Sequence, residues 1–260
     1  MSAAVPEQAL ELAVRAADAA GEVARKYFRS SFDVEKKDDE SPVTIADREA
    51  ETVIRDIIEE VFPEHGIFGE EHGNVRTDAE YVWTLDPIDG TQSFVTGRPL
   101  FGTLIALLHS NRPVLGIIDM PALGERWIGA DGIAATFNGT AVTTRDCTDM
   151  GNAWLSTTSP QMFEGDDAVR FETLRQKVWR TQYGSDCYAY GLLANAGLDL
   201  VVEASMQPYD YCALVPVIEG AGGVITDWQG QPLGMNSDGR VLAAGNAPLH
   251  TAAMNILNGG

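Results

Sequence analysis

Two carboxylates three residues apart follow a hydrophobic run in the segment LDPIDGT, residues 85–91. Pro87 fixes its own φ angle and removes a hydrogen-bond donor, which favours a tight turn with Asp86 and Asp89 pointing the same way. Carboxylate oxygens, together with the carbonyl oxygen of Ile88, are ligands that Mg²⁺ accepts. The segment alone permits two interpretations, a metal-binding turn and a solvated Asp-Pro-x-Asp-Gly surface turn.

The residues that follow and precede this turn could extend the same chemistry. Gly90 and Thr91 begin a short segment whose N–H groups could hold a phosphate. The pair Glu70-Glu71 stands between two glycines in FGEEHG. One of these acids could be a metal ligand, or the segment could be a polar loop after a strand.

Three more acids lie at predicted element ends. Asp47 lies in the first turn of a predicted helix, where its ordinary role is capping and its alternative role is to orient a water through a Thr hydroxyl. Glu203 ends a predicted strand, and Asp210 opens a helix that it could simply cap. Together these acids are the set that a two- or three-metal phosphatase requires.

The charge balance supports a role for metal. The chain has 260 residues with 18 Lys and Arg and 38 Asp and Glu, a formal net charge of −20. This balance disfavours nucleic acid and anionic membranes as partners because both carry negative charge. Residues 78–97 contain neither Lys nor Arg. A phosphate bound there would need divalent cations to offset the carboxylates.

The cysteine pattern and the N-terminal segment indicate the cellular compartment. Three widely spaced cysteines form neither a disulfide framework nor a zinc motif, which favours a reducing compartment. The N-terminus resembles neither a signal peptide nor a transit peptide, and no stretch is apolar enough to span a membrane. We therefore expect a cytoplasmic protein without a membrane partner.

The elements that position these acids follow from the hydrophobic pattern. Apolar residues at helical spacing predict helices over 7–28 and about 44–62, the second capped by Thr44 and Asp47, with a polar exposed loop over 36–42 between them. Alternating runs predict successive antiparallel strands at 81–85, 102–108, 114–119, 125–129 and 135–137. In the second half of the chain, predicted strands alternate with predicted helices. The strands are expected at 153–157, 199–203, 223–227 and 241–245. The helices are expected at 166–178, 187–197 and 211–222, the last kinked by Pro216. The polar segment 143–152 is the predicted boundary between an N-terminal α+β subdomain (1–145) and a C-terminal α/β subdomain (146–260).

At this point the sequence resembles the inositol monophosphatase family of metal-dependent phosphatases. GEE (69–71), DPIDGT (86–91) and Asp210 followed by EGAGG (219–223) stand in that family's order and spacing. The resemblance covers nearly the whole chain. It implies an α+β fold, a layered αβαβα sandwich, and Mg²⁺-dependent hydrolysis of a small phosphate monoester with two or three Mg²⁺ per site. It also implies a homodimer.

The resemblance assigns roles position by position. It implies that the metal ligands are Glu70, Asp86, the Ile88 carbonyl, Asp89 and Asp210. It implies that Thr91 and Asp47, with Glu70, serve catalysis by placing the attacking water. Substrate contacts would come from Gly90, Thr91, Ser185, Asp186 and Glu203.

Longer runs, among them GSDCYAYGLLANAGLDLVVE, look like the histidinol-phosphate phosphatase branch, which implies conversion of L-histidinol phosphate to L-histidinol in histidine biosynthesis. Two additional carboxylates, Asp186 and Glu203, suit a cationic substrate better than a neutral polyol. Asp186 could instead cap the following helix. The alternatives are an inositol monophosphatase or another small phosphatase of the same family, and a non-catalytic, metal-binding regulatory protein.

Overall fold

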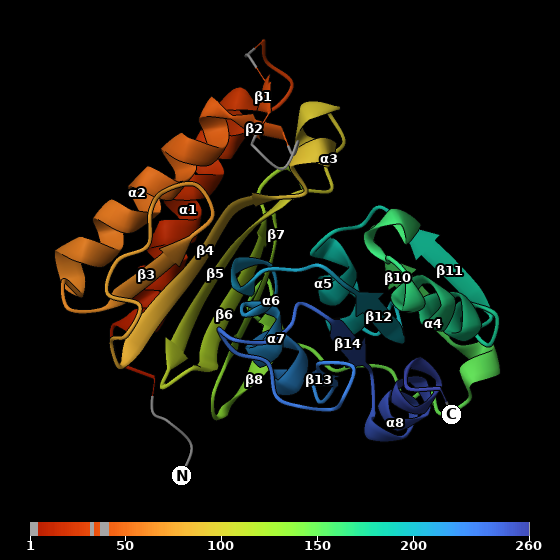
Figure 1. Ribbon diagram of the computed structural model, residues 1–260. Helices are drawn as coiled ribbons and strands as arrows, with labels where there is room; N and C mark the ends of the chain where they lie inside the picture. Colours follow the sequence, from red (N-terminus) through yellow and green to blue (C-terminus); the bar gives the residue numbers. More distant parts are fainter. Residues whose placement is uncertain (1–4, 32–33, 37–41, 260) are drawn as a thin grey trace.

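The computed structural model describes residues 5–31, 34–36 and 42–259. Five layers follow one another across the molecule: two helices, a seven-stranded sheet, a group of short helices, a five-stranded sheet and a last pair of helices (Figure 1). This arrangement confirms the predicted α+β fold, a layered αβαβα sandwich. Among the described residues, no helix combines the length and apolar character needed to cross a membrane.

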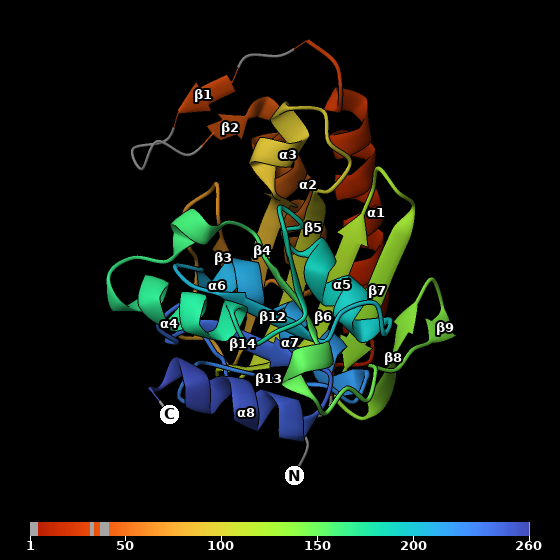
Figure 2. The ribbon, with the colours of Figure 1, turned by 90° about the vertical axis from the view of Figure 1, so that its right-hand side faces the viewer.

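The first layer consists of α1 (Ala9–Tyr27) and α2 (Ile45–Val61), which pack on each other and on the sheet. Small residues dominate the buried side of α1, so the helix lies close to the strands beneath it. Thr44 caps α2 in a capping box with Asp47, as predicted. Between the helices, β1 (Val34–Lys36) and β2 (Pro42–Thr44) pair as a two-stranded sheet beside α3 (Thr91–Val95) (Figure 2). The predicted loop 36–42 therefore begins and ends in strand, and its central residues, 37–41, lie outside the described part of the chain.

The seven-stranded sheet runs in sequence order. It comprises β3 (Gly66–Gly69), β4 (Tyr81–Asp89), β5 (Gly102–His109), β6 (Arg112–Met120), β7 (Glu125–Ala130), β8 (Ile133–Phe137) and β9 (Thr140–Ala141). All neighbours pair antiparallel except β3 and β4, which are parallel. The sheet confirms the predicted series of antiparallel strands. The β4–β5 register shifts between Asp86 and Asp89, so the chain leaves regular pairing at the acidic turn.

The middle layer consists of α5 (Tyr188–Ala194), α6 (Pro208–Tyr211) and α7 (Leu214–Gly220). The prediction of one kinked helix over 211–222 was wrong, because the chain forms two short helices separated at 212–213. Pro216 has no N–H to donate to the carbonyl of Cys212, four residues earlier, and it lies in the first turn of α7, where that N–H is not needed. The break aims α6 toward the end of β4 while α7 packs on β6 and β7.

The second sheet and the outer helices complete the fold. The strand order is β11 (Arg180–Tyr183), β10 (Trp154–Thr157), β12 (Leu200–Glu203), β14 (Val241–Ala244) and β13 (Val224–Thr226). Its outer face is covered by α4 (Asp166–Arg175) and α8 (Ala247–Leu257), with 3₁₀ turns at Met150–Asn152 and Pro160–Met162 (Figure 1). The polar segment 143–152 lies between the last strand of the first sheet and the first strand of the second. β11 and α8 were not predicted.

Candidate active site

Three of the predicted metal ligands meet between the two sheets. Asp86 and Asp89 lie at the end of β4, and Asp210 lies in the first turn of α6. One carboxylate oxygen from each of the three lies within 4.8 Å of the others. The backbone holds each carboxylate: the N–H of Ile88 donates to Asp86 (3.0 Å), and the N–H of Gln207 donates to Asp210 (2.7 Å). Asp210, more than 120 positions away in sequence, therefore joins Asp86 and Asp89 in one cluster.

The electrostatics of this cluster fit divalent cations. Burial, followed by the charges of Glu70 and Asp89, holds the pKa of Asp86 well above its usual range. Burial and the charges of Asp186 and Asp210 do the same to Asp89. Burial raises the pKa of Asp210 to about 7. Within the described part of the chain, no Lys or Arg pairs with Asp86, Asp89 or Asp210. Asp86 is buried and Asp89 and Asp210 are partly buried, and oxygen ligands that repel one another in this way are the donor set that a hard cation stabilises.

Glu70 and the Ile88 carbonyl lie at the rim of this cluster. The N–H of Glu70 donates to the carbonyl of Leu85 (3.1 Å), which continues the β3–β4 pairing past the end of β3. Glu70 is outside the 4.8 Å group, but its charge raises the pKa values of Asp86, Asp47 and Asp210. The Ile88 carbonyl accepts a hydrogen bond from the Thr91 hydroxyl (3.1 Å). Their roles as metal ligands stay predictions.

Asp47 and Thr91 come from different elements and meet. Asp47 is buried and accepts two hydrogen bonds from Thr44, from its N–H (2.9 Å) and from its hydroxyl (2.6 Å). Its other oxygen lies 3.5 Å from the Thr91 hydroxyl. Asp47 thus caps α2 with one oxygen and directs the second to Thr91. Burial raises the pKa of Asp47, against the lowering effect of Thr44.

Gly90 allows the C-terminal half of the chain to approach the acidic turn. It has a φ of 82°, in the left-handed region, and its ideal Cβ would lie 2.9 Å from Asp186 Oδ2. The Ser93 hydroxyl donates to that same oxygen (3.2 Å). The next N–H, of Cys187, donates to Asp89 Oδ2 (2.7 Å). The N-cap residue of α5 is Cys187, whose side chain makes no capping hydrogen bond, and the hydrogen bond described for the Asp186 carboxylate comes from Ser93 and not from the helix. Burial raises the pKa of Asp186.

Glu203 is the most firmly held acid of the site. It is 3% exposed at the end of β12. Thr158 donates to Glu203 Oε1 from its N–H (2.9 Å) and its hydroxyl (2.6 Å), and the Tyr190 hydroxyl donates to Oε2 (2.9 Å). Burial raises the pKa of Glu203 to about 7, against these hydrogen bonds, which lower it. Ser185, also predicted as a substrate contact, is buried just before Asp186, and its carbonyl accepts from the N–H of Tyr188 (3.0 Å).

A cavity of about 160 Å³ joins the two groups of acids. Its lining includes Asp89 and Asp210 from the carboxylate cluster, and Asp186 and Glu203 from the C-terminal half. Sequence analysis missed Thr158 and Tyr190. Thr158 could have been found, because it follows β10, a strand parallel to β12, and the carboxyl ends of parallel strands share one edge. Tyr190 gave no signal, since an aromatic residue in an apolar helix looks like core.

Comparisons with known proteins agree with this geometry. The profile of the inositol monophosphatase family matches residues 5–258. The chain is 50% identical over 250 residues to "Bifunctional phosphatase IMPL2, chloroplastic" of Arabidopsis thaliana, covering 93% of this chain and 72% of that relative. It is 35% identical over 236 residues to a histidinol-phosphatase of Chlorobaculum parvum, covering 90% and 91%.

A solved structure is similar over its full length. An inositol monophosphatase from Zymomonas mobilis is 47% identical, with a TM-score of 0.90, covering 98% of this chain and all of that one. Relatives named for two different substrates are thus similar in sequence to this chain, and the solved one is also similar in fold. The family profile matches nearly all residues, and three acids of the predicted motifs meet in the structure. These findings establish the family. The chain belongs to the inositol monophosphatase family, a family of metal-dependent phosphatases.

Proposed function

We propose that this protein hydrolyses L-histidinol phosphate to L-histidinol and phosphate. The observation that carries the proposal is the cavity in which Asp186 and Glu203 face the space beside Asp89 and Asp210. Histidinol phosphate carries an ammonium group and an imidazole that can take a proton. Carboxylates in a buried wall favour such a cation over a neutral polyol.

The two carboxylates are not equivalent. Arg98, whose guanidinium donates to the Gly184 carbonyl (3.0 Å), lowers the pKa of Asp186 and offsets part of its charge. Glu203 is held by neutral donors, Thr158 and Tyr190. Glu203 is therefore the stronger candidate for contact with the ammonium group. Asp186 is the candidate for a second contact with the substrate, at a carboxylate that Ser93 and Arg98 also engage.

We further propose that Asp86, Asp89, Asp210, Glu70 and the Ile88 carbonyl hold two or three Mg²⁺ ions. When bound, these ions supply positive charge that offsets the phosphoryl oxygens and makes water a better nucleophile at neutral pH.

The chain's own residues would do the rest. Asp47, fixed by Thr44, would take the Thr91 hydroxyl hydrogen that the Ile88 carbonyl now accepts, which leaves the Thr91 oxygen to accept from the attacking water. Gly90 and Thr91 present backbone N–H groups to the phosphate at the start of α3. Because the attack is by water in line with the leaving oxygen, no covalent phosphoenzyme is required.

The test is phosphate release from L-histidinol phosphate and from inositol 1-phosphate, side by side, with Mg²⁺ and with EDTA. Mg²⁺-dependent preference for histidinol phosphate is the expected result. Asp186→Ala should then lower kcat/KM for histidinol phosphate more than for the inositol ester. An equal loss on both substrates would contradict the cation-reading role, and release from neither would revive the non-catalytic, metal-binding alternative.

A second candidate is hydrolysis of inositol monophosphate. The 47% identity to the Zymomonas mobilis inositol monophosphatase over the full chain favours it. The carboxylate cluster would serve both substrates, so only the Asp186 and Glu203 side of the cavity separates them. Preference for the inositol ester in the same assay would select this candidate. We also propose that the protein is a cytoplasmic homodimer. Light scattering of the purified protein gives its molar mass and so tests the dimer.

A further inference from the structure

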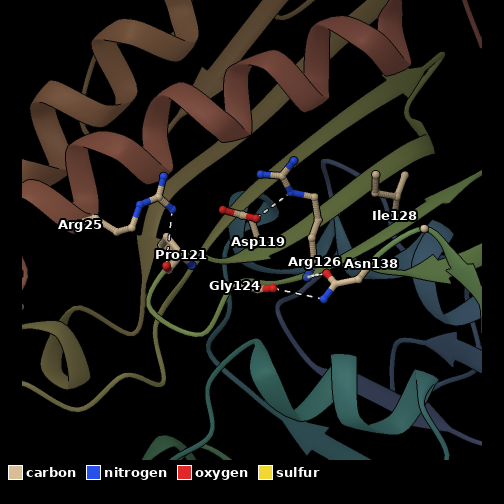
Figure 3. A pocket seen from close by; sticks show the side chains of 8 residues that line it. Arg25, Asp119, Pro121, Gly124, Arg126, Ile128 and Asn138 are labelled. Atoms are coloured by element: carbon tan, nitrogen blue, oxygen red, sulfur yellow. Dashed lines mark hydrogen bonds and ion pairs between the residues drawn. The ribbon is translucent and has the colours of Figure 1, made fainter.

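A cavity of about 350 Å³ lies between α1 and the strands β6 and β7, and it shares no described lining residue with the active-site cavity (Figure 3). Arg25 and Arg126 line it, and Asp119 is the one acid among its described lining residues. Asp119 Oδ1 accepts from Arg126 Nε (2.7 Å), and its Oδ2 is shielded from solvent. A cationic group here would meet two guanidinium groups and no free carboxylate, so the organic part of a cationic substrate belongs in the active-site cavity.

The active-site cavity has an apolar lining beside its four carboxylates. Its volume is about 160 Å³, roughly the space of five water molecules. Met162, from the 3₁₀ turn after β10, and Met206, from the segment after β12, both line it. Both residues are partly buried, so part of each is free to contact a ligand. Ala204 and Leu214 add to this apolar lining.

The backbone holds both methionines in place. The Ser205 hydroxyl donates to the Met162 carbonyl (3.3 Å), which joins the 3₁₀ turn to the segment after β12, and the Thr157 hydroxyl donates to Met162 Sδ (3.3 Å). The Met206 N–H donates to the carbonyl of Gly239 (3.0 Å). Gly239 has a φ of 82°, and its ideal Cβ would lie 2.4 Å from the Met206 carbonyl oxygen, so only glycine permits this approach. The two methionines therefore lie side by side at the cavity because of contacts outside it.

Met206 also lies beside the acid proposed to bind the ammonium group. Its Sδ lies 3.9 Å from the Tyr190 hydroxyl, which donates to Glu203 Oε2 (2.9 Å). In histidinol, one methylene joins the imidazole ring to the carbon that bears the ammonium group. A ring bound against Met206 is therefore within reach of an ammonium group bound at Glu203.

We propose that Met162 and Met206 bind the imidazole ring of the substrate and so help to determine specificity, an inference that rests on the proposed hydrolysis of histidinol phosphate. A thioether is polarisable and makes favourable contacts with aromatic rings. An inositol ring carries a hydroxyl or a phosphate on every carbon, and hydroxyls against the methionines would lose hydrogen bonds to water without replacement. The carboxylates thus select a positive charge, and the methionines select an aromatic ring.

The test removes the ring and the methionine, separately and together. Isothermal titration calorimetry in Mg²⁺ measures Kd of the wild-type chain and of Met206→Gln for L-histidinol and for L-alaninol, which has a hydrogen in place of the ring. The wild-type chain should bind L-histidinol more tightly than L-alaninol. Met206→Gln should reduce that advantage about 2-fold to 10-fold, the size of one sulfur–aromatic contact. An advantage that is absent in the wild type, or unchanged in the variant, would overturn the proposal.

Steady-state kinetics adds a second measurement. For histidinol phosphate, Met206→Gln should raise KM by about the same factor with little change in kcat, and turnover of inositol 1-phosphate should not fall. Met235→Gln is the matched control, because Met235 is partly buried against the same apolar core as Met206 but does not line the cavity. If Met206→Gln does not fold, Met162→Gln carries the same test from another element.

The two proposals fail in different ways. A wild-type preference for histidinol phosphate, together with an equal loss on both substrates in Met206→Gln, would refute the role of the methionines and leave the proposed function standing. A wild-type preference for the inositol ester would refute the proposed function itself.

Discussion

Tyr190→Phe isolates the charge of Glu203 from the shape of the cavity. The substitution keeps the ring and removes only the hydroxyl that donates to Glu203 Oε2 (2.9 Å). Tyr190 is fully buried, so water cannot replace the lost donor without rearrangement. Because that hydrogen bond lowers the pKa of Glu203, its loss raises the pKa above its present value of about 7. Glu203 should then be mostly protonated at neutral pH.

The size of the effect follows from the same hydrogen bond. A hydrogen bond to a charged group contributes about 1.5–3 kcal/mol, which is about 10-fold to 150-fold in the ionisation equilibrium of Glu203. With a starting pKa of about 7, half of Glu203 is ionised at pH 7. The ionised fraction should therefore fall about 5-fold to 75-fold. If Glu203 binds the ammonium group, kcat/KM for histidinol phosphate should fall by the same factor, mainly through KM.

The assay is phosphate release at saturating Mg²⁺ from pH 6.5 to 9, with histidinol phosphate and inositol 1-phosphate. The deficit on histidinol phosphate should shrink as pH rises, because Glu203 ionises again, and the inositol ester should lose much less. Tyr211→Phe is the matched control: its hydroxyl is also buried but donates to the Gly234 carbonyl (2.9 Å). An equal, pH-independent loss on both substrates would refute the reasoning, since it would make Tyr190 a packing residue only.

Three further predictions concern the metal cluster and the packing that holds it. Asp89→Asn should remove most turnover without unfolding the chain, because one carboxylate ligand oxygen is lost while the shape is kept; near-normal turnover at saturating Mg²⁺, with an unchanged circular dichroism melt, would contradict it. In EDTA, Tm should rise as pH falls from about 8 to about 5, because carboxyl groups such as Asp210 and Glu203, with a pKa of about 7 in the folded state, bind protons there that the unfolded chain binds only near pH 4. Mg²⁺ should raise Tm most at pH 8, and a Tm that instead falls on acidification in EDTA would argue against repulsion within the cluster. Gly116→Ala should destabilise the fold by about 2 kcal/mol or more, because its Cβ would lie 2.0 Å from a backbone carbonyl between α6 and α7; Gly73→Ala, which meets nothing within 4 Å, is the control in the same denaturant melt.

Much of the fold could be predicted from the local sequence. Hydrophobic periodicity located α1, α2 and the strands from β4 to β8, because each of these elements buries one face or both in a regular pattern. The capping box of Thr44 and Asp47 was readable because it is formed by residues three apart. The turn at residues 85–91 was readable for the same reason: proline, glycine and two carboxylates act on one another within seven residues.

Long-range structure decided what periodicity does not encode. The edge strand β11 has the burial of a surface loop, since three of its four residues are exposed, and so its pattern could not predict it. Pro216 indicated a kink, but the apolar pattern around it did not show that the kink becomes a full break between α6 and α7. The break matters to the site, because it directs Asp210 toward the end of β4.

The sequence by itself determined which acids this protein brings to the site and that they need positive charge, because residue types and short spacings are local properties. Only the tertiary structure decided that these acids lie close together. Asp210 joins Asp86 and Asp89 only after α6 packs against β4, and Glu203 becomes a held carboxylate only when Thr158 and Tyr190 enclose it. Such contacts join residues many positions apart, and they form only when the layers bury the apolar surface between the two sheets.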